Sequence, residues 1–467
     1  MSAGRHDAQG AAQPEAPTIA VTAAALRRGE TTSVALTEAC LQRIAVHDSA
    51  INAFITVLGE QARQQAREAD RELAAGRDRG PLHGIPISLK DIVDVKGTPT
   101  TAASRVRSGH VAPADAPIVA RLREAGAVLI GKTNLHEFAL GTTNEESAFG
   151  AVHHPLDESR SPGGSSGGSA ASVLAGMAYA SVGTDTGGSV RIPASVCGLV
   201  GLKPSYGELS TEGVVPLSTT LDHVGPLCRS VDDARMLFEV LAGNDAGTSG
   251  LVREGGDNLR GMRFGALSEY FTAILDPQIS ARFQETRALL IRAGATVEDV
   301  ALSHAADITT VYLHIVLAEA AAYHATALDS RADAYTEPVR LRLEMGRYIL
   351  AEDYLRALRG RDALTQEVNL ALQHHDALLL PTLAIAAPRL GAQTVRVGSG
   401  EEPVRNVMLR LTQLFNITGH PAITLPCGLT QDGLPAGVQV VGVPSRTADL
   451  LSVAAAVENQ LGPGRSG

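Results

Sequence analysis

The chain has 467 residues and a formal net charge of -10, with 44% hydrophobic and 19% charged residues. This length and balance predict a globular protein with an ample buried core and exclude a disordered chain. Because a phosphate backbone would be repelled and no dense Lys/Arg run is present, we expect no nucleic-acid partner.

The N-terminal segment differs from the rest of the chain. Residues 1–16 carry no apolar stretch that could serve as a signal peptide, so we expect a disordered tail before a single domain over residues 17–467. No later run reaches the ~18 apolar residues of a membrane span. These features predict a cytoplasmic protein with no membrane partner.

The first predicted elements are two helices, from Ser33 to His47 and from Gly59 to Ala75. From Gly84 onward, short apolar runs separated by Gly, Pro and Ser predict strands, with a helix near Ile118–Ala125 between two of them. Further strands are expected at Arg263–Leu267, Ala377–Pro381, Ala422–Pro426 and Gly437–Val443. Residues 305–372 have a helical pattern and could form a cap. Alternating buried strands and helices are typical of an α/β sheet covered on both faces.

Lysine use is unusual. Of 40 basic residues only four are lysines, namely Lys90, Lys96, Lys132 and Lys203. Unlike arginine, a buried lysine can lose its proton and act as a base, so a lysine retained in an apolar setting is a candidate for chemistry. Lys90 lies in such a setting, the run ISLKDIV.

The densest signal is SPGGSSGGSAASVLAG at residues 161–176, followed by TDTGGSVRIP at residues 184–193. Glycines beside serines let backbone N–H groups approach a reacting carbonyl, as an oxyanion hole requires. Phosphate binding is the first alternative, but the Walker and dinucleotide spacings are both missing. A flexible linker is the second, but both runs continue into apolar segments.

Together with GIPISLKD and GKTNLHEFALGTTNEESAFG upstream, these runs resemble the amidase signature family, most densely over residues 80–230. The resemblance implies one α/β/α domain with a large mixed β-sheet covered by helices. It also implies a triad of Lys90, Ser165 and Ser189, with Ser165 following a cis peptide bond. Ser189, the implied nucleophile, lies 24 residues after Ser165, the spacing expected in the family.

The resemblance also implies roles for the surrounding residues. The oxyanion hole would be formed by the backbone N–H groups of Thr186, Gly187, Gly188 and Ser189. Ser166 would orient the relay. From their position beside the nucleophile, Asp185 and Arg191 are expected to brace the loop by pairing, with proton transfer as the alternative. Ala139, Gly141 and Thr142 match a segment that lines the acyl side of the cleft, with a packing loop free of ligand contact as the alternative.

The chemistry agrees with these roles. A serine hydroxyl needs a base, and no histidine accompanies the glycine-rich runs. A neutral Lys90 can take a proton from Ser165, which takes one from Ser189. This mechanism uses no metal and no cofactor, and the four widely spaced cysteines suggest neither a zinc site nor disulfides.

We therefore expect hydrolysis of a linear amide C–N bond in a small molecule, through an acyl-enzyme on Ser189 and by a monomer or homodimer. Aryl esters, anilides and carbamates present a similar carbonyl, so urethanase-like activity is included. The alternative is the amidase subunit of a glutamine-dependent amidotransferase. In that branch an acidic residue commonly precedes T-x-x-x-N-x-x-G, whereas here Leu409–Leu411 precedes Thr412–Gly419. The branch also usually has Gln where this chain has Ile192.

Overall fold

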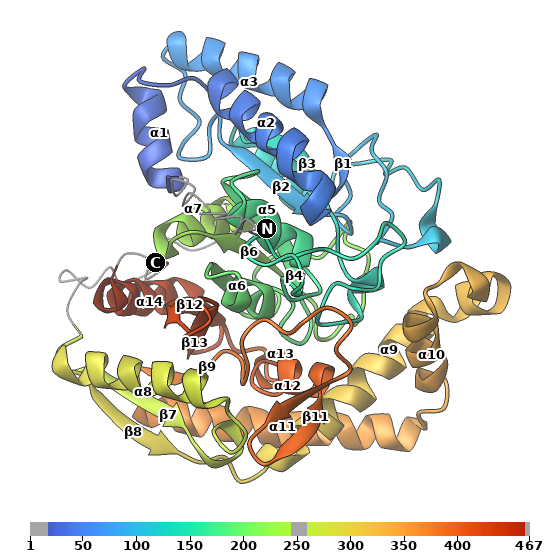
Figure 1. The fold of residues 1–467 in the computed structure, drawn as a ribbon, viewed down its shortest axis with the longest axis vertical. Coiled ribbons are helices and arrows are strands. Elements are labelled where there is room, and N and C mark those ends of the chain that lie inside the picture. The colour runs from blue at the N-terminus through green and yellow to red at the C-terminus, as the bar shows by residue number, and fades with distance from the viewer. Residues whose placement is uncertain (1–16, 244–258, 463–467) are drawn as a thin grey trace, which may run out of the picture.

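One sheet of eleven strands runs through the computed structural model, which describes residues 17–243 and 259–462 (Figure 1). The expected tail over residues 1–16 lies outside the described residues. From edge to edge the strands are β1 (Phe54–Val57), β3 (Val128–Thr133), β2 (Pro86–Lys90), β4 (Ala180–Asp185), β6 (His223–Cys228), β5 (Val200–Lys203), β12 (Ala422–Leu429), β13 (Pro435–Val441), β9 (Ala377–Pro381), β7 (Arg263–Leu267) and β8 (Thr296–Val300). A separate hairpin contains β10 (Thr394–Val397) and β11 (Gly400–Pro403).

The sheet is mixed. Strand β2 is parallel to β3 and β4, and β7 is parallel to β8 and β9, while the other neighbours are antiparallel. Parallel strands need crossover helices, whereas antiparallel neighbours do not. The predicted fold class, a large mixed sheet covered by helices, is confirmed.

Helices cover the sheet on both faces. One large apolar cluster contains residues of α1 (Ile19–Arg27), α2 (Ser33–Ile51), α4 (Pro117–Glu124), α7 (Val231–Ala242), α8 (Pro277–Arg292) and α14 (Thr447–Leu461). The other contains residues of α6 (Arg191–Val196), α9 (Ile308–Arg331), α10 (Glu337–Gly346), α11 (Ala351–His374), α12 (Val404–Leu409) and α13 (Leu414–Ile417). Helix α5 (Gly167–Leu174) contributes to both, and α3 (Gly59–Ala74) packs beside α2 and β3.

Strand β9 shows how the sheet separates the two clusters. Ala377 and Leu379 belong to the first cluster, whereas Leu378 and Leu380 belong to the second. Side chains alternate between faces along a strand, so a strand covered on both sides is apolar throughout. This is why a continuous apolar run predicted β9 with the bounds observed.

Strand β7 also has the predicted bounds, and α2, α3, α4, β12 and β13 are found with shifts of a few residues. Strand β8 was not predicted. Its sequence TVEDV is mostly exposed because it forms an edge of the sheet, where acidic residues are tolerated. The apolar pattern that identifies buried strands is therefore missing there.

The predicted helical cap over residues 305–372 contains α9, α10 and α11, of which α9 packs against the other two (Figure 1). Within the described residues, one helical stretch, Ala305–Ala334, has the length and mean hydropathy (1.3) of a membrane span. Half of its most apolar window is buried inside the protein.

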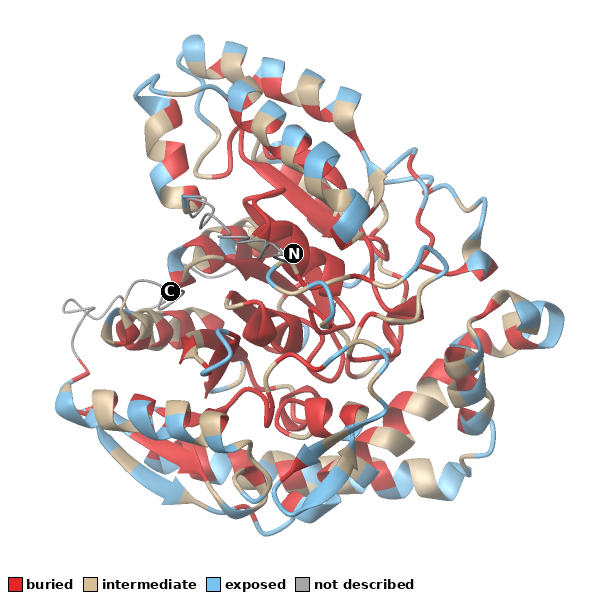
Figure 2. Ribbon diagram, in the orientation of Figure 1, coloured by how far each residue is buried: buried red, intermediate tan, exposed pale blue. Residues whose placement is uncertain are grey.

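Burial is most complete at the centre of the sheet. Strands β2 and β4 and helix α6 are buried along their whole length, and Figure 2 shows this region surrounded by helices with exposed outer faces. Polar side chains in this region need partners inside the protein. The candidate active site is made of such side chains.

Candidate active site

Lys90 ends strand β2 and is fully buried. Its Nζ donates to Oγ of Ser165 at 2.8 Å and to Oγ1 of Thr184 at 2.9 Å. Burial disfavours the ammonium form and lowers the pKa of Lys90 to about 7, although the charges of Asp222 and Asp185 act in the opposite direction. A substantial fraction of Lys90 is thus a neutral amine near pH 7.

Ser165 lies in the loop before α5, and its peptide bond to Gly164 is cis. The loop is packed tightly, because a Cβ at Gly164 would come 2.9 Å from the backbone nitrogen of Asn144. The N–H of His136 donates to the carbonyl of Ser165 at 3.1 Å. These contacts hold the Ser165 hydroxyl against Lys90.

The loop Thr186–Ser189 follows strand β4. Gly188 has φ +137, and a Cβ there would overlap the hydroxyl of Thr412, so only glycine fits. A Cβ at Gly187 would similarly overlap the hydroxyl of Tyr312. The two glycines therefore allow the backbone to turn closely beside Ser189.

The two serine-bearing loops lie side by side. The N–H of Ser166 donates to the carbonyl of Ser189 at 3.3 Å, and the Ser166 hydroxyl donates to the carbonyl of Thr184 at 3.2 Å. Ser189 is 5% exposed, whereas Ser165 is fully buried. Of the two serines, Ser189 is thus the one that a substrate can reach.

A buried ion pair supports the Ser189 loop from behind. Nη2 of Arg191 lies 2.8 Å from Oδ1 of Asp185, and Arg191 also donates to Oδ1 of Asn416 at 2.6 Å. Burial would raise the pKa of Asp185, but Arg191 and Asn416 bring it below its usual value. Asp185 is therefore held as a charged acceptor, which suits a brace and not proton transfer.

The segment Ala139–Thr142, the predicted acyl-side loop, lies close to the relay. A Cβ at Gly164 would come 3.0 Å from the carbonyl carbon of Thr142. A Cβ at Gly141 would overlap the buried His136 ring. The geometry places this loop beside Ser165, and its contact with substrate stays a prediction.

Several residues of the site were not predicted from the sequence. Thr184 accepts from Lys90, Thr412 donates to the carbonyl of Gly187 at 2.6 Å, and Asp222 accepts from the Thr186 hydroxyl at 2.6 Å. The T-x-x-x-N segment was a signal for Thr412 and Asn416, whereas no local signal identifies Asp222.

The other lysines behave differently. Lys132 and Lys203 are fully buried, Lys132 beside Asp91 and Lys203 with its Nζ donating to the carbonyl of Pro204 at 3.0 Å. Lys96 is exposed. Three of the four retained lysines are thus buried. Burial alone therefore does not identify the candidate base, and the partners of each Nζ have to distinguish it.

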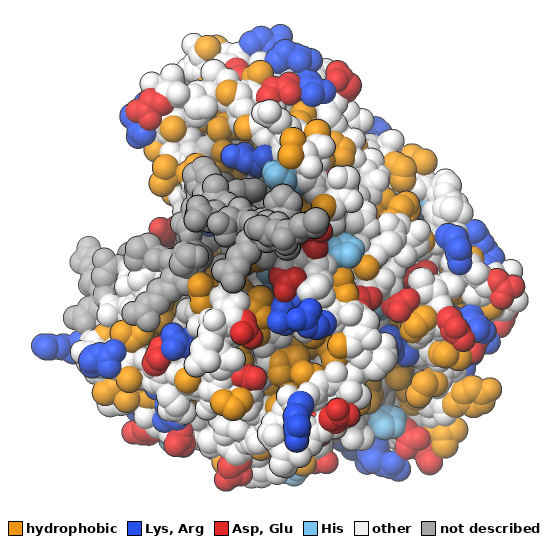
Figure 3. All heavy atoms as spheres, viewed as in Figure 1, with side chains coloured by type: hydrophobic (Ala, Val, Ile, Leu, Met, Phe, Trp, Pro, Cys, Tyr) orange, Lys and Arg blue, Asp and Glu red, His pale blue; other side chains and the backbone are white. Residues whose placement is uncertain are grey.

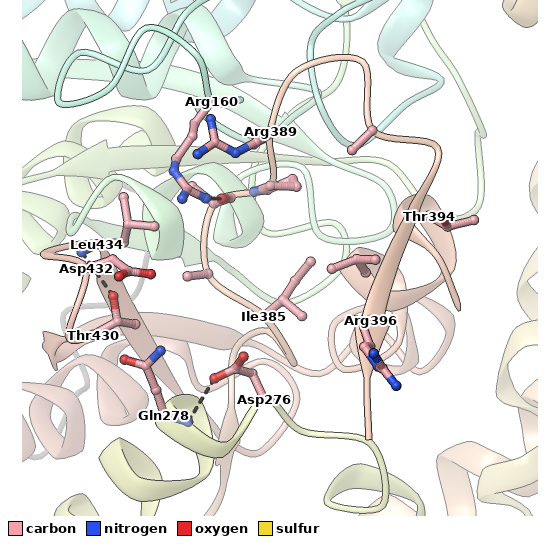
Figure 4. Close-up of a pocket in the computed structure, with 15 residues that line it drawn as sticks. Arg160, Asp276, Gln278, Ile385, Arg389, Thr394, Arg396, Thr430, Asp432 and Leu434 are labelled. Carbon is pink, nitrogen blue, oxygen red and sulfur yellow. Dashed lines mark hydrogen bonds between the residues drawn. The ribbon is translucent and has the colours of Figure 1, made fainter. Parts of the chain in front are cut away.

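A cavity of about 370 Å³ lies between the start of α8, the loop before β10 and the β12–β13 turn (Figure 4). Arg160 and Arg389 lie at one end and Asp276 and Gln278 at the other. Its lining contains none of the three predicted triad residues. Within residues 17–243 and 259–462, no group of three or more His, Cys, Asp or Glu side chains could hold a metal ion.

Comparisons relate this arrangement to known proteins. The Amidase family profile matches residues 35–451. A glutamyl-tRNA(Gln) amidotransferase subunit of Koribacter versatilis is 38% identical over 480 residues, covering 95% of this chain and 98% of the relative. A solved amidase structure matches with TM-score 0.90 and 39% identity, covering 96% of this chain and 100% of that one. The solved glutamyl-tRNA(Gln) amidotransferase subunit from Thermotoga maritima matches with TM-score 0.78 and 34% identity, covering 95% of each chain.

The mixed sheet and its two helical layers define an α/β protein, and the family match makes it an enzyme of the class that acts on carbon–nitrogen bonds. The profile match covers most of the sequence, and the relatives match over nearly their full length. The chain belongs to the Amidase family, and the resemblance noted from its motifs is confirmed.

The predicted partners require correction. We expected a small-molecule substrate, no nucleic acid, and a monomer or homodimer. The curated relatives are instead subunits of an amidotransferase named for a tRNA, which contradicts that expectation. The prediction of no nucleic-acid partner was drawn from the net charge, and the net charge of one chain does not determine the partners of an assembly. Charges of both signs are interspersed on the face in Figure 3.

Proposed function

We propose that this protein cleaves a linear carboxylic amide through an acyl-enzyme on Ser189. The observation that carries the proposal is the 2.8 Å hydrogen bond from buried Lys90 to Ser165, next to the loop that bears Ser189. A buried amine with a pKa of about 7 suits a general base at neutral pH.

In the proposed reaction, Ser189 Oγ attacks the amide carbonyl as its proton passes to Ser165, whose own proton passes to Lys90. The backbone N–H groups of Thr186–Ser189 stabilise the oxyanion, where one such donor typically contributes ~10²–10³ in rate. The relay then returns a proton to the nitrogen as the C–N bond breaks and the amine leaves. Water then attacks the acyl carbonyl and gives a proton to the relay. The bond to Ser189 Oγ breaks, Oγ regains a proton, and the carboxylic acid leaves. Aryl esters, anilides and carbamates would enter by the same attack.

Two biological roles share this chemistry. The curated relatives favour the subunit of a glutamine-dependent amidotransferase, in which the released ammonia is transferred to a second substrate. Two sequence features favour a stand-alone hydrolase: Leu409–Leu411 precedes Thr412 where the amidotransferase branch commonly has an acid, and Ile192 stands where it usually has Gln. The solved amidase with TM-score 0.90 is consistent with the second role.

A covalent probe tests the shared chemistry. A fluorophosphonate should label Ser189 at one equivalent per chain, detected by peptide mass spectrometry, and Ser189→Ala should abolish both labelling and turnover. Treatment with EDTA should leave turnover intact. Turnover that is lost to EDTA and restored by zinc would contradict the proposal.

Substrate assays distinguish the two roles. The purified chain is supplied with glutamine, with and without added glutamyl-tRNA(Gln) and candidate partner subunits, and ammonia release is measured. A parallel panel contains p-nitroanilide, p-nitrophenyl ester and aryl carbamate substrates. Glutaminase activity that requires a partner supports the subunit role, whereas turnover of the panel by the chain alone supports the hydrolase.

A further inference from the structure

Asp222 lies beside the nucleophile loop although no motif marks it. Strands β4 and β6 pair in antiparallel register, with Asp185 opposite His223. The next two residues, Thr186 and Asp222, therefore face each other just beyond the last backbone pair. A side-chain hydrogen bond of 2.6 Å, from the Thr186 hydroxyl to Oδ1 of Asp222, joins the two strands at this point.

The other oxygen of Asp222 organises the loop that precedes β6. Oδ2 accepts from the N–H groups of Leu217 at 2.9 Å and Ser218 at 3.1 Å. One carboxylate thus connects the loop 217–222 to the first residue of the Thr186–Ser189 loop. Hydrogen bonds to a carboxylate are roughly twice as strong as those between neutral groups.

The same loop is fastened to the helical cap. Glu319 of α9 accepts from the Ser218 hydroxyl at 2.6 Å and from the hydroxyl and N–H of Thr220 at 2.7 and 3.1 Å. It also accepts from the Tyr354 hydroxyl of α11 at 2.9 Å. Ser218 donates to both carboxylates, so a chain of hydrogen bonds runs from Glu319 in the cap through Ser218 and Asp222 to Thr186.

Asp222 also acts on Lys90 through its charge. Burial lowers the pKa of Lys90, and among the groups that oppose this effect Asp222 is the strongest. Burial raises the pKa of Asp222 to about 6, against the hydrogen bonds from Thr186 and the loop and the attraction of Lys90. Near neutral pH, Asp222 is thus a negative charge that favours protonated Lys90.

Few other titratable groups face this pair. Asp185, at the end of β4, also attracts Lys90 but is already paired with an arginine at 2.8 Å. Burial lowers the pKa of His136, beside the relay, and raises the pKa of Tyr312 of α9, so both stay neutral near pH 7. Removing the charge of Asp222 should therefore be visible in the titration of Lys90.

We propose that Asp222 is a positioning residue of the amide-cleaving site, which holds the Thr186–Ser189 loop in place and adds a negative charge near Lys90, while Glu319 ties the loop 217–222 to the cap. The inference rests on the proposed function, since it assigns a role within the Ser189 mechanism. Asp222 acts through Thr186 and Lys90 and takes no part in bond making or breaking.

The test uses Asp222→Asn in the full chain, with activity towards a p-nitrophenyl ester measured across pH. We expect kcat to fall by about 10–100-fold, part of the loss seen when an oxyanion donor is removed. The acid limb of kcat/KM should move to lower pH by about one unit, because Lys90 loses a nearby negative charge. A purely structural role would lower kcat without moving that limb.

Asp233→Asn is the matched control. The Asp233 carboxylate also accepts from two backbone N–H groups, those of Ile19 and Ala20, and burial also raises its pKa to about 6. It belongs to α7 and has no contact with the relay. We expect its kcat and acid limb to match the wild type; the same changes as in Asp222→Asn would overturn the proposal.

Thr186 provides a second test should Asp222→Asn fail to fold. Thr186→Val removes the hydroxyl and should lower kcat by about tenfold, whereas Thr186→Ser keeps it and should lose clearly less. Equal kcat values for the two variants would overturn the proposal. Fluorophosphonate labelling distinguishes failure of the proposed function from failure of the positioning role. An unlabelled, inactive wild type refutes the proposed function. A labelled wild type with unchanged Asp222→Asn kinetics refutes only the positioning role.

Discussion

Two buried lysines on neighbouring strands have opposite surroundings. In the parallel pair β2–β3, Leu89 lies opposite Lys132 and Lys90 lies opposite Thr133, so the two lysines point to opposite faces of the sheet. Nζ of Lys132 lies 2.9 Å from Oδ1 of Asp91, with both side chains fully buried. The hydrogen bonds of Nζ of Lys90 go instead to the hydroxyls of Ser165 and Thr184.

This difference shows that the partner, and not burial alone, determines what a buried lysine can do. Burial lowers the pKa of both, but at Lys132 the charge and hydrogen bond of the adjacent Asp91 act against it. Lys132 can remain an ammonium ion within an ion pair. Lys90 can release its proton and accept another, because hydroxyl partners do not require it to be charged.

The largest expected effect tests Lys90 as the base. Lys90→Arg keeps the positive charge but has no neutral form at working pH, and Lys90→Ala has no base at all. We expect both variants to lose at least about 10³-fold in kcat. Turnover is measured with a p-nitrophenyl ester, and folding is checked by circular dichroism. Near wild-type turnover in a folded Lys90→Arg variant would refute the Ser-Ser-Lys mechanism.

The second prediction compares stability at the two positions. Lys132→Met leaves the buried Asp91 carboxylate without its cation and should lower the free energy of unfolding by about 3–5 kcal/mol. Lys90→Met removes hydrogen bonds to two hydroxyls and a charge with no carboxylate in direct contact, and should cost less than about 2 kcal/mol. Urea denaturation at pH 7 measures both. Equal losses would mean that the two environments do not differ as described.

The third prediction concerns the wild-type pH profile. Because the pKa of Lys90 is lowered to about 7, the neutral amine predominates above this pH and is lost below it. We expect kcat/KM to fall about tenfold for each pH unit below the pKa of Lys90. The protein must be shown to stay folded between pH 5 and 8. A kcat/KM that does not change with pH over this range would contradict the assignment of Lys90 as the base.

The smallest effect is expected for Lys132→Arg, the matched control for Lys90→Arg. Arginine keeps the charge beside Asp91, but its larger side chain must fit a fully buried site, which costs about 1–3 kcal/mol. We expect a lower melting temperature and a kcat within about threefold of the wild type. A loss of kcat as large as that of Lys90→Arg would indicate that Lys132 also takes part in the chemistry.

The sequence predicted the buried parts of the fold better than its edges. Strands β7 and β9 have the predicted bounds because apolar runs between polar segments mark covered strands. Both edge strands were missed, since β1 has only four residues and β8 carries charged residues that conceal it. The fully buried central strands β5 and β6 were also not assigned. Edge strands are specified by pairing with a neighbour and only weakly by their own composition.

The candidate site also contains residues that the sequence predicted and residues that it did not. The family resemblance implied the triad of Lys90, Ser165 and Ser189, and its signals lie within short segments, where a lysine is retained among arginines and serines lie beside glycines. Asp222 and Glu319 were not identified. Each acts through contacts that only the fold creates, such as the hydrogen bonds that join Glu319 to Ser218 and Thr220, and a single carboxylate outside any recognised motif carries no spacing signal.

The sequence by itself determined the family and the residue types able to perform the chemistry, because these depend on side-chain identity and short-range spacing. The tertiary structure decided which buried lysine has hydroxyl partners and which has a carboxylate, since Asp91 and Lys132 come together only when β2 and β3 pair. It also decided that Thr186 meets Asp222, through the β4–β6 register. A pKa depends on burial and neighbouring charges, and both exist only once the chain has folded.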